Sequence, residues 1–223
     1  MSVSHGGRCS HQNKDETFGG VKMIIPQLKD EKIKSYVESI EIKYRKKVLF
    51  DDIVNDPRKT SYLLGTYNEN DLNIFVYLNK ALFFRDELVK HTIIHELIHC
   101  EMDKEGYPIT RNIEGYKNDV RMKKIGTALV DAVIHIELNS RQKEAGLFFV
   151  KFEKASDSLA KNLVERGIEI ASQREFLDKL LFDDQRLSVK DAFDKLRELI
   201  VVLGFEEYFE IISGSSCPPA VSK

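Results

Sequence analysis

The segment from Arg85 to Asp103 constrains the fold of this chain more than any other part of the sequence. It contains RDELVKHTIIHELIHCEMD, and its middle is apolar almost all round, which predicts a helix buried in the centre of the molecule. Two histidines, His95 and His99, lie four residues apart and therefore extend from one face of this helix, one turn above each other. The rest of the chain must then supply elements that surround it.

Hydropathy patterns predict a helix and three strands before this segment. Apolar residues between 27 and 46 recur at helical spacing. The strands are expected at residues 48–54, 61–67 and 72–79, the last being rich in β-branched and aromatic residues. The stretch Asn68–Asp71 is a turn signal, so we expect the last two strands to form an antiparallel hairpin.

Helices are expected to make up most of the chain after the central segment. Gly and Pro residues predict a loop over residues 104–116, and a third helix is expected over 117–141. Residues 146–212 are expected to be helical, amphipathic near 157–171 and 188–203. The expected fold class is therefore α+β. It would comprise a helix, a small antiparallel sheet, the central helix and a third helix, followed by a helical C-terminal region.

Composition separates a compact part of the chain from two tails. Residues 1–20 contain almost nothing to bury and predict a disordered N-terminal tail, while residues 213–223 predict a flexible C-terminal tail. Between them we expect a core over residues 21–145, which contains the central helix, and a helical region over residues 146–212 packed on that core.

Charge balance and cysteine content limit the expected partners and compartment. The chain has 34 Lys and Arg against 36 Asp and Glu, which gives no reason to expect a nucleic-acid or membrane partner. The basic run from Lys43 to Lys47 is expected to be a solvated helix face. No apolar run reaches the roughly 18 residues that span a bilayer, and no signal peptide is evident. Three cysteines are a poor disulfide framework, so we expect a cytoplasmic protein.

The string His95-Glu96-Leu97-Ile98-His99 predicts the chemistry. Two imidazoles one turn apart can each bring a nitrogen to about 2.0–2.1 Å from one zinc ion. Glu96 lies beside that face, where its carboxylate can act as general base toward a water activated by the metal. A chance HExxH in such a chain is expected on the order of one per cent of the time. The alternative, in which both histidines are ordinary core residues, stays open.

Zinc needs a third protein ligand and a fourth position open to water. In the third helix, Asp131 and His135 lie four residues apart on an otherwise apolar stretch, where polar groups are costly unless they are paired or bind metal. We expect His135 to be the ligand, with Asp131 as a carboxylate that orients it or as an alternative ligand. A plain hydrogen bond between Asp131 and His135 is the competing interpretation. Glu137 lies well round the helix and is expected to point elsewhere.

Neighbouring polar residues have simpler expected roles. His91 precedes His95 by one turn, but three histidines in a row would span about 12 Å, so we interpret His91 as a core or pocket-wall residue. Cys100 is expected to be an inert buried thiol. Tyr107 and Tyr116 could donate to an oxyanion, although partial packing at the surface is the simpler expectation for each.

These motifs resemble those of the zincin metallopeptidases. The similarity covers roughly residues 27–141, with the strand Leu72–Asn79, the string HELIH on a helix and a later ligand-bearing helix. It implies that His95 and His99 bind zinc, that Glu96 is the general base, and that the strand binds an extended peptide by strand addition. The chain lacks the extended motif of metzincins and the downstream pattern of gluzincins, and is most similar to compact bacterial or phage zincin-like proteins.

Three functions fit these residues. The first is a zinc-dependent metallopeptidase that hydrolyses a peptide or protein substrate. The second keeps the metal site but hydrolyses a different amide or ester. The third is a zinc-stabilised protein-interaction or regulatory module without turnover, in which the C-terminal helices form the binding surface.

Overall fold

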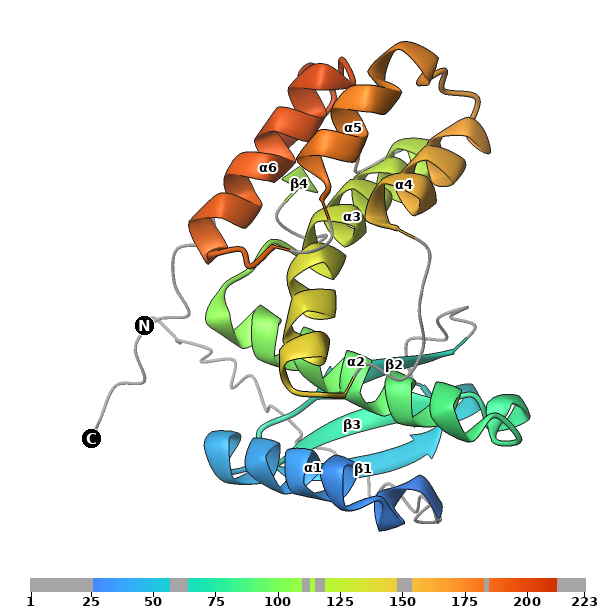
Figure 1. Cartoon of the computed structure of the whole chain (residues 1–223), viewed down its shortest axis with the longest axis vertical. Helices are drawn as coiled ribbons and strands as arrows, with labels where there is room; N and C mark the ends of the chain where they lie inside the picture. Colours follow the sequence, from blue (N-terminus) through green and yellow to red (C-terminus); the bar gives the residue numbers. More distant parts are fainter. Residues whose placement is uncertain are drawn as a thin grey trace, which may run out of the picture.

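Figure 1 shows the computed structural model of the chain. The residues that it describes are 26–56, 64–109, 113–114, 119–147, 154–182 and 185–211. The tails predicted at residues 1–20 and 213–223 lie outside the described residues.

The described part of the chain is an α+β arrangement that is mostly helical. Its α-helices are α1 (Glu31–Tyr44), α2 (Asp86–Glu105), α3 (Val120–Glu144), α4 (Ala155–Val164), α5 (Arg174–Leu180) and α6 (Val189–Val202). Its strands are β1 (Lys47–Asp52), β2 (Gly65–Glu69), β3 (Asn73–Leu78), β4 (Ile113–Glu114) and β5 (Glu210–Ile211). The three helices predicted before residue 145 are confirmed with shifted ends, and the predicted loop at 104–116 contains the short strand β4.

The main sheet is mixed, with the strand order β1-β3-β2. The predicted antiparallel hairpin of β2 and β3 is confirmed, but β1 pairs with β3 in parallel, so the expectation of an antiparallel sheet is wrong. Since β2 runs opposite to β1 and the hairpin reverses the chain again, β3 regains the direction of β1. As the central strand, β3 is paired on both sides and has no free edge for a peptide. Within the described sheet, the edge strand β2 packs against α2.

Side-chain caps set the ends of two elements. Asp30 accepts a hydrogen bond from the Lys32 amide, so α1 begins later than its hydropathy pattern predicts. Asp52 accepts a hydrogen bond from the Val54 amide, and a short 3-10 turn (Ile53–Asn55) follows where the pattern predicts a continuing strand.

The basic run from Lys43 to Lys47 is largely exposed, as its sequence predicts, although of its basic residues only Lys43 lies in α1. Arg45 adopts a left-handed conformation with φ 54° and ends the helix. Lys43 pairs with Glu101 on α2, and Lys46 pairs with Glu69 on β2. These lysines therefore tie neighbouring elements together.

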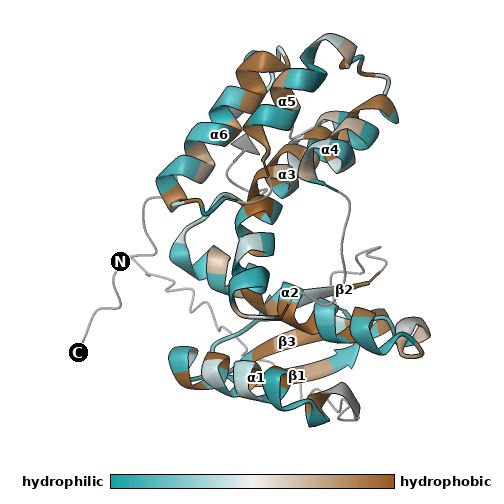
Figure 2. Cartoon of the chain, in the orientation of Figure 1, coloured by the Kyte–Doolittle hydropathy of each residue, from teal (hydrophilic) through white to brown (hydrophobic). Residues whose placement is uncertain are grey.

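α2 is the centre of the molecule, as its sequence predicts. It packs against β2, β3, α1 and α3, and α1 also contacts β1. α3 leads from the C-terminal helices α4 and α6, which contact it, down to α2 (Figure 1). In Figure 2 the ribbon of β3 is mostly brown, whereas that of α1 is largely teal and white. The predicted division near residue 145 falls at the end of α3.

Buried apolar residues form one cluster that continues from Ile33 on α1 to Phe209 near the end of the described chain. The sheet, α2, α3 and the C-terminal helices therefore share one core. No helix within the described ranges is long and apolar enough to cross a membrane.

Candidate metal centre

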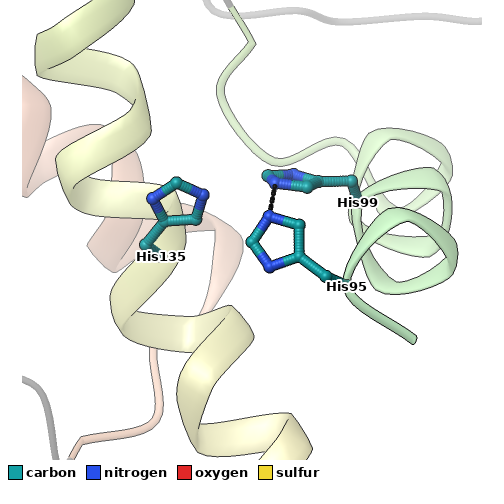
Figure 3. Close-up of side chains that lie close together, drawn as sticks. All are labelled: His95, His99 and His135. Carbon is teal, nitrogen blue, oxygen red and sulfur yellow. Dashed lines mark hydrogen bonds between the residues drawn. The ribbon is translucent and has the colours of Figure 1, made fainter. Parts of the chain in front are cut away.

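Three histidines from two helices converge at one point (Figure 3). His95 and His99 extend from α2, and His135 extends toward them from α3. One nitrogen from each ring can be chosen so that all three lie within 4.8 Å of one another. The ring centroid of His135 lies 5.1 Å from that of His95 and 5.3 Å from that of His99. The structure thus brings together the three residues predicted as ligands, and together they could bind a metal ion.

The spacing of the nitrogens suits a small divalent cation. The Nε2 atoms of His95 and His99 lie 3.1 Å apart, and a tetrahedral ion with bonds of 2.0–2.1 Å needs donors about 3.3 Å apart. The Nδ1 atom of His95 is buried and has no hydrogen-bond partner in the described part of the chain. His95 therefore faces the cluster through Nε2. All three residues are intermediate in burial.

Burial keeps these imidazoles neutral. It lowers the pKa of His135 to about 4 and, together with the charge of His135, lowers that of His99 to about 3. Burial and the neighbouring histidines hold the pKa of His95 well below its usual value. A neutral imidazole presents a lone pair, which is the form that binds a metal ion. The three donors are therefore ready for coordination near pH 7.

Two carboxylates on α3 lie outside the cluster. Asp131 precedes His135 by one turn, and within the described residues it forms no hydrogen bond to that ring, so the competing interpretation of a plain pair is not observed. Its role as an orienting or alternative ligand remains a prediction. Glu137 is fully buried and accepts hydrogen bonds from Arg141 and the Leu187 amide. It points away from the histidines, as expected.

Glu96 directly follows His95 on α2. Its side chain is 9% exposed. Burial raises the pKa of the Tyr67 phenol on β2, and charges on Asp103, Cys100 and Glu96 raise it further. The Tyr67 hydroxyl donates to the Asp103 carboxylate on α2 at 3.2 Å, so this residue of β2 lies against α2. No sequence signal pointed to Tyr67, because its proximity depends on how β2 packs on α2.

The other candidates on α2 have the structural positions that we expected. His91 is buried, with its ring centroid 5.7 Å from that of His95, and it does not join the cluster. Burial and the charge of His135 lower its pKa to about 4. Cys100 is buried, and burial raises the pKa of its thiol to about 12, so it is not a reactive nucleophile.

Tyr107 is neither at the surface nor available to an oxyanion. Its side chain is 5% exposed, and its hydroxyl donates to the Leu187 carbonyl at 2.5 Å. Arg141 donates to the same hydroxyl at 3.3 Å. Surface packing is therefore the wrong expectation, because the segment before α6 covers this residue. Tyr116 lies outside the described residues.

Comparison of the chain with family models, curated proteins and solved structures finds no match. The candidate metal centre therefore depends on the residues and their geometry alone.

Proposed function

We propose that the chain is a zinc-dependent hydrolase, and specifically a metallopeptidase. His95, His99 and His135 would hold the metal, and Glu96 would act as general base. The observation that carries this proposal is the convergence of three neutral imidazoles from α2 and α3, with Glu96 directly after one of them. When bound, zinc supplies the Lewis acidity that activates water and polarises a carbonyl group.

The donor set favours zinc in a catalytic site over zinc in a closed structural site. Neutral imidazole is a common zinc ligand, and structural zinc sites are almost always closed by four protein ligands, often cysteines. Within the described residues the candidate cluster contains three histidines and no cysteine. None of the three residues is fully buried, and the proposed function requires substrate to approach from their exposed side.

Glu96 suits the role of base by its position on α2. It neighbours His95 and is mostly shielded from solvent, so its charge acts strongly on groups close to it. In the proposed reaction its carboxylate accepts a proton from the attacking water and returns it to the leaving nitrogen. The edge strand β2, which contacts α2, would align an extended peptide in place of the central strand β3.

A zinc-stabilised interaction module without turnover is the second candidate. The observation in its favour is that the ligands come from both α2 and α3, and that α3 also packs on α4 and α6. A metal ion would therefore join the sheet-bearing part of the chain to the C-terminal helices whether or not it performs hydrolysis.

Substitution of Glu96 by Gln distinguishes the two functions. We expect Glu96→Gln to retain stoichiometric zinc and to lower kcat/KM by roughly 10²–10⁴-fold, since it removes proton transfer but not a ligand. The measurement is cleavage of a proteome-derived peptide library together with metal analysis. Glu101→Gln is the matched control. Glu101 also lies on α2 and is also 9% exposed, but its carboxylate accepts hydrogen bonds from Tyr36 and Lys43 and has no role in the proposed reaction. Biological activity that survives Glu96→Gln unchanged would favour the interaction module.

A further inference from the structure

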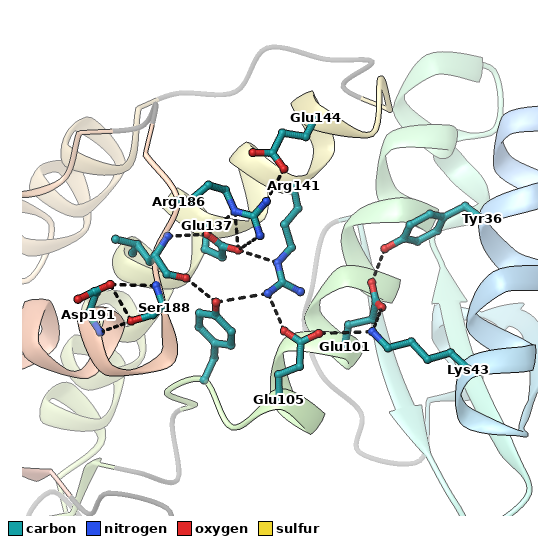
Figure 4. A network of polar contacts seen from close by, with 12 residues as sticks. Tyr36, Lys43, Glu101, Glu105, Glu137, Arg141, Glu144, Arg186, Ser188 and Asp191 are labelled. Carbon is teal, nitrogen blue, oxygen red and sulfur yellow. Dashed lines mark hydrogen bonds and ion pairs between the residues drawn. The ribbon is translucent and has the colours of Figure 1, made fainter.

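The two helices that carry the histidines are also joined by ion pairs away from the metal centre (Figure 4). Glu105, in the last turn of α2, accepts a hydrogen bond from the Arg141 Nη2 atom on α3 at 2.6 Å. The Nε atom of Arg141 donates to Glu137, one turn earlier on α3, at 2.8 Å. A continuous polar path therefore runs from α2 to the interior of α3.

Glu137 anchors this path. It is fully buried, and beyond Arg141 it accepts hydrogen bonds from Arg186 Nε at 3.0 Å and from the Leu187 amide at 2.7 Å. A buried carboxylate with several charged and backbone donors has little freedom to move. Arg141 is thus held by a fixed group on its own helix while its guanidinium extends to α2.

The polar path from Glu105 through Arg141 to Glu137 constrains the rotation of α3, and this rotation determines where His135 points. Glu137 and Arg141 lie one turn apart on one face of α3, and His135 is two residues before Glu137, about 200° around the helix. Arg141 follows His135 by six residues, about 120° around the helix, so rotation of α3 about its axis would displace both side chains relative to α2. A bond from Arg141 to Glu105 therefore resists the rotation that would carry the His135 ring away from His95 and His99.

We infer that Glu105 and Arg141 are positioning residues for the metal centre. They hold α3 at the rotation that directs His135 toward the two histidines of α2, so that the site is formed before metal arrives. This inference rests on the proposed metal site. Preorganised ligands bind a metal more tightly, because the protein does not have to rearrange on binding.

The test compares two carboxylates that pair with arginines of the same network. Glu105→Ala breaks the bond between α2 and α3. Glu144→Ala is the control, because Glu144 pairs with Arg186 and has no bond to α2 among the described contacts. Each purified variant is titrated with Co²⁺, whose visible absorption reports coordination geometry, and with Zn²⁺ in competition.

We expect Glu105→Ala to weaken metal affinity about tenfold, at the lower end of the effect of supporting residues, and to alter the cobalt absorption spectrum. Glu144→Ala should match the wild type in both measurements. Glu105→Gln should recover most of the affinity, because its amide oxygen still accepts from Arg141. The inference would be overturned if Glu105→Ala bound Co²⁺ with wild-type affinity and spectrum, or if Glu144→Ala lost as much metal affinity as Glu105→Ala. Either result would leave the proposed metal centre itself standing. A wild-type chain that binds neither metal would overturn the metal centre as well.

Discussion

His135 is the residue on which the proposed metal centre depends most. His95 and His99 come from one motif, whereas His135 follows His99 by 36 positions and reaches the site only through the packing of α3. The other polar residue on its stripe, Asp131, is exposed to solvent, and the protein around it nonetheless raises the pKa of its carboxyl group. The two residues are therefore the natural pair for testing the identity of the third ligand.

Replacement of His135 by Ala should abolish stoichiometric zinc binding. Loss of a supporting residue costs roughly 10–100-fold in affinity, so loss of a ligand should cost more than about 100-fold. Asp131→Asn, one turn away on the same helix, should retain zinc with little change. Affinities come from competition with a chromophoric chelator. If Asp131→Asn lost the metal and His135→Ala kept it, the third ligand would be Asp131.

At the scale of elements, the close packing of β2 on α2 depends on Gly65. A Cβ atom at this position would lie 2.6 Å from Thr92 Cγ2 and 2.9 Å from the Tyr77 carbonyl oxygen. We expect Gly65→Ala to lower the free energy of unfolding by about 1–3 kcal/mol through overpacking, as measured by urea denaturation.

Thr92→Ser in the Gly65→Ala background tests this cause. It removes the nearest methyl group and keeps the hydroxyl that donates to the Leu88 carbonyl. Part of the lost stability should return, and part should remain lost because of the Tyr77 carbonyl. A double variant no more stable than Gly65→Ala would show that contact with Thr92 is not the cause.

The buried ion pair within α3 should matter more than an exposed pair of the same spacing. Glu137→Ala removes the buried acceptor that Arg141, Arg186 and the Leu187 amide share, although the two arginines keep Glu105 and Glu144, so we expect a loss of about 3 kcal/mol in the free energy of unfolding.

Glu175→Ala on α5 is the comparison for Glu137→Ala. Glu175 also pairs with a cation four residues later, Lys179, but both side chains are largely exposed. Its removal should change the free energy of unfolding by no more than about 0.5 kcal/mol. Equal losses in the free energy of unfolding of Glu137→Ala and Glu175→Ala would mean that the segment before α6 does not need Glu137 to stay in place.

For the molecule as a whole, a metal ion at the three histidines would join α2 to α3 and so bridge the sheet-bearing part and the C-terminal helices. Zinc should stabilise the folded chain by about 2.7 kcal/mol when free zinc is 100 times Kd. The readout is Tm with zinc and with excess chelator, and His135→Ala should remove the difference. An increase in Tm that persists in His135→Ala would place the bound metal elsewhere.

Sequence periodicity predicted those elements whose patterns are long and local. The helical spacing around His95, the turn signal between β2 and β3 and the apolar stretch of α3 each describe neighbours along the chain, and each element is present. Boundaries were less accurate, because caps such as Asp30 and Asp52 decide them through single hydrogen bonds. The direction of β1 was missed, because pairing between strands far apart in sequence leaves no local pattern.

The sequence by itself determined that His95 and His99 share one face of a buried helix, since a separation of four residues matches one helical turn whatever surrounds it. Only the tertiary structure decided that His135 completes the cluster, that Tyr107 and Glu137 belong to a separate polar network, and that β3 is the central strand. These outcomes depend on how α2, α3 and the strands pack together. Packing arises from contacts between residues that are distant in the chain, which spacing within one element does not specify.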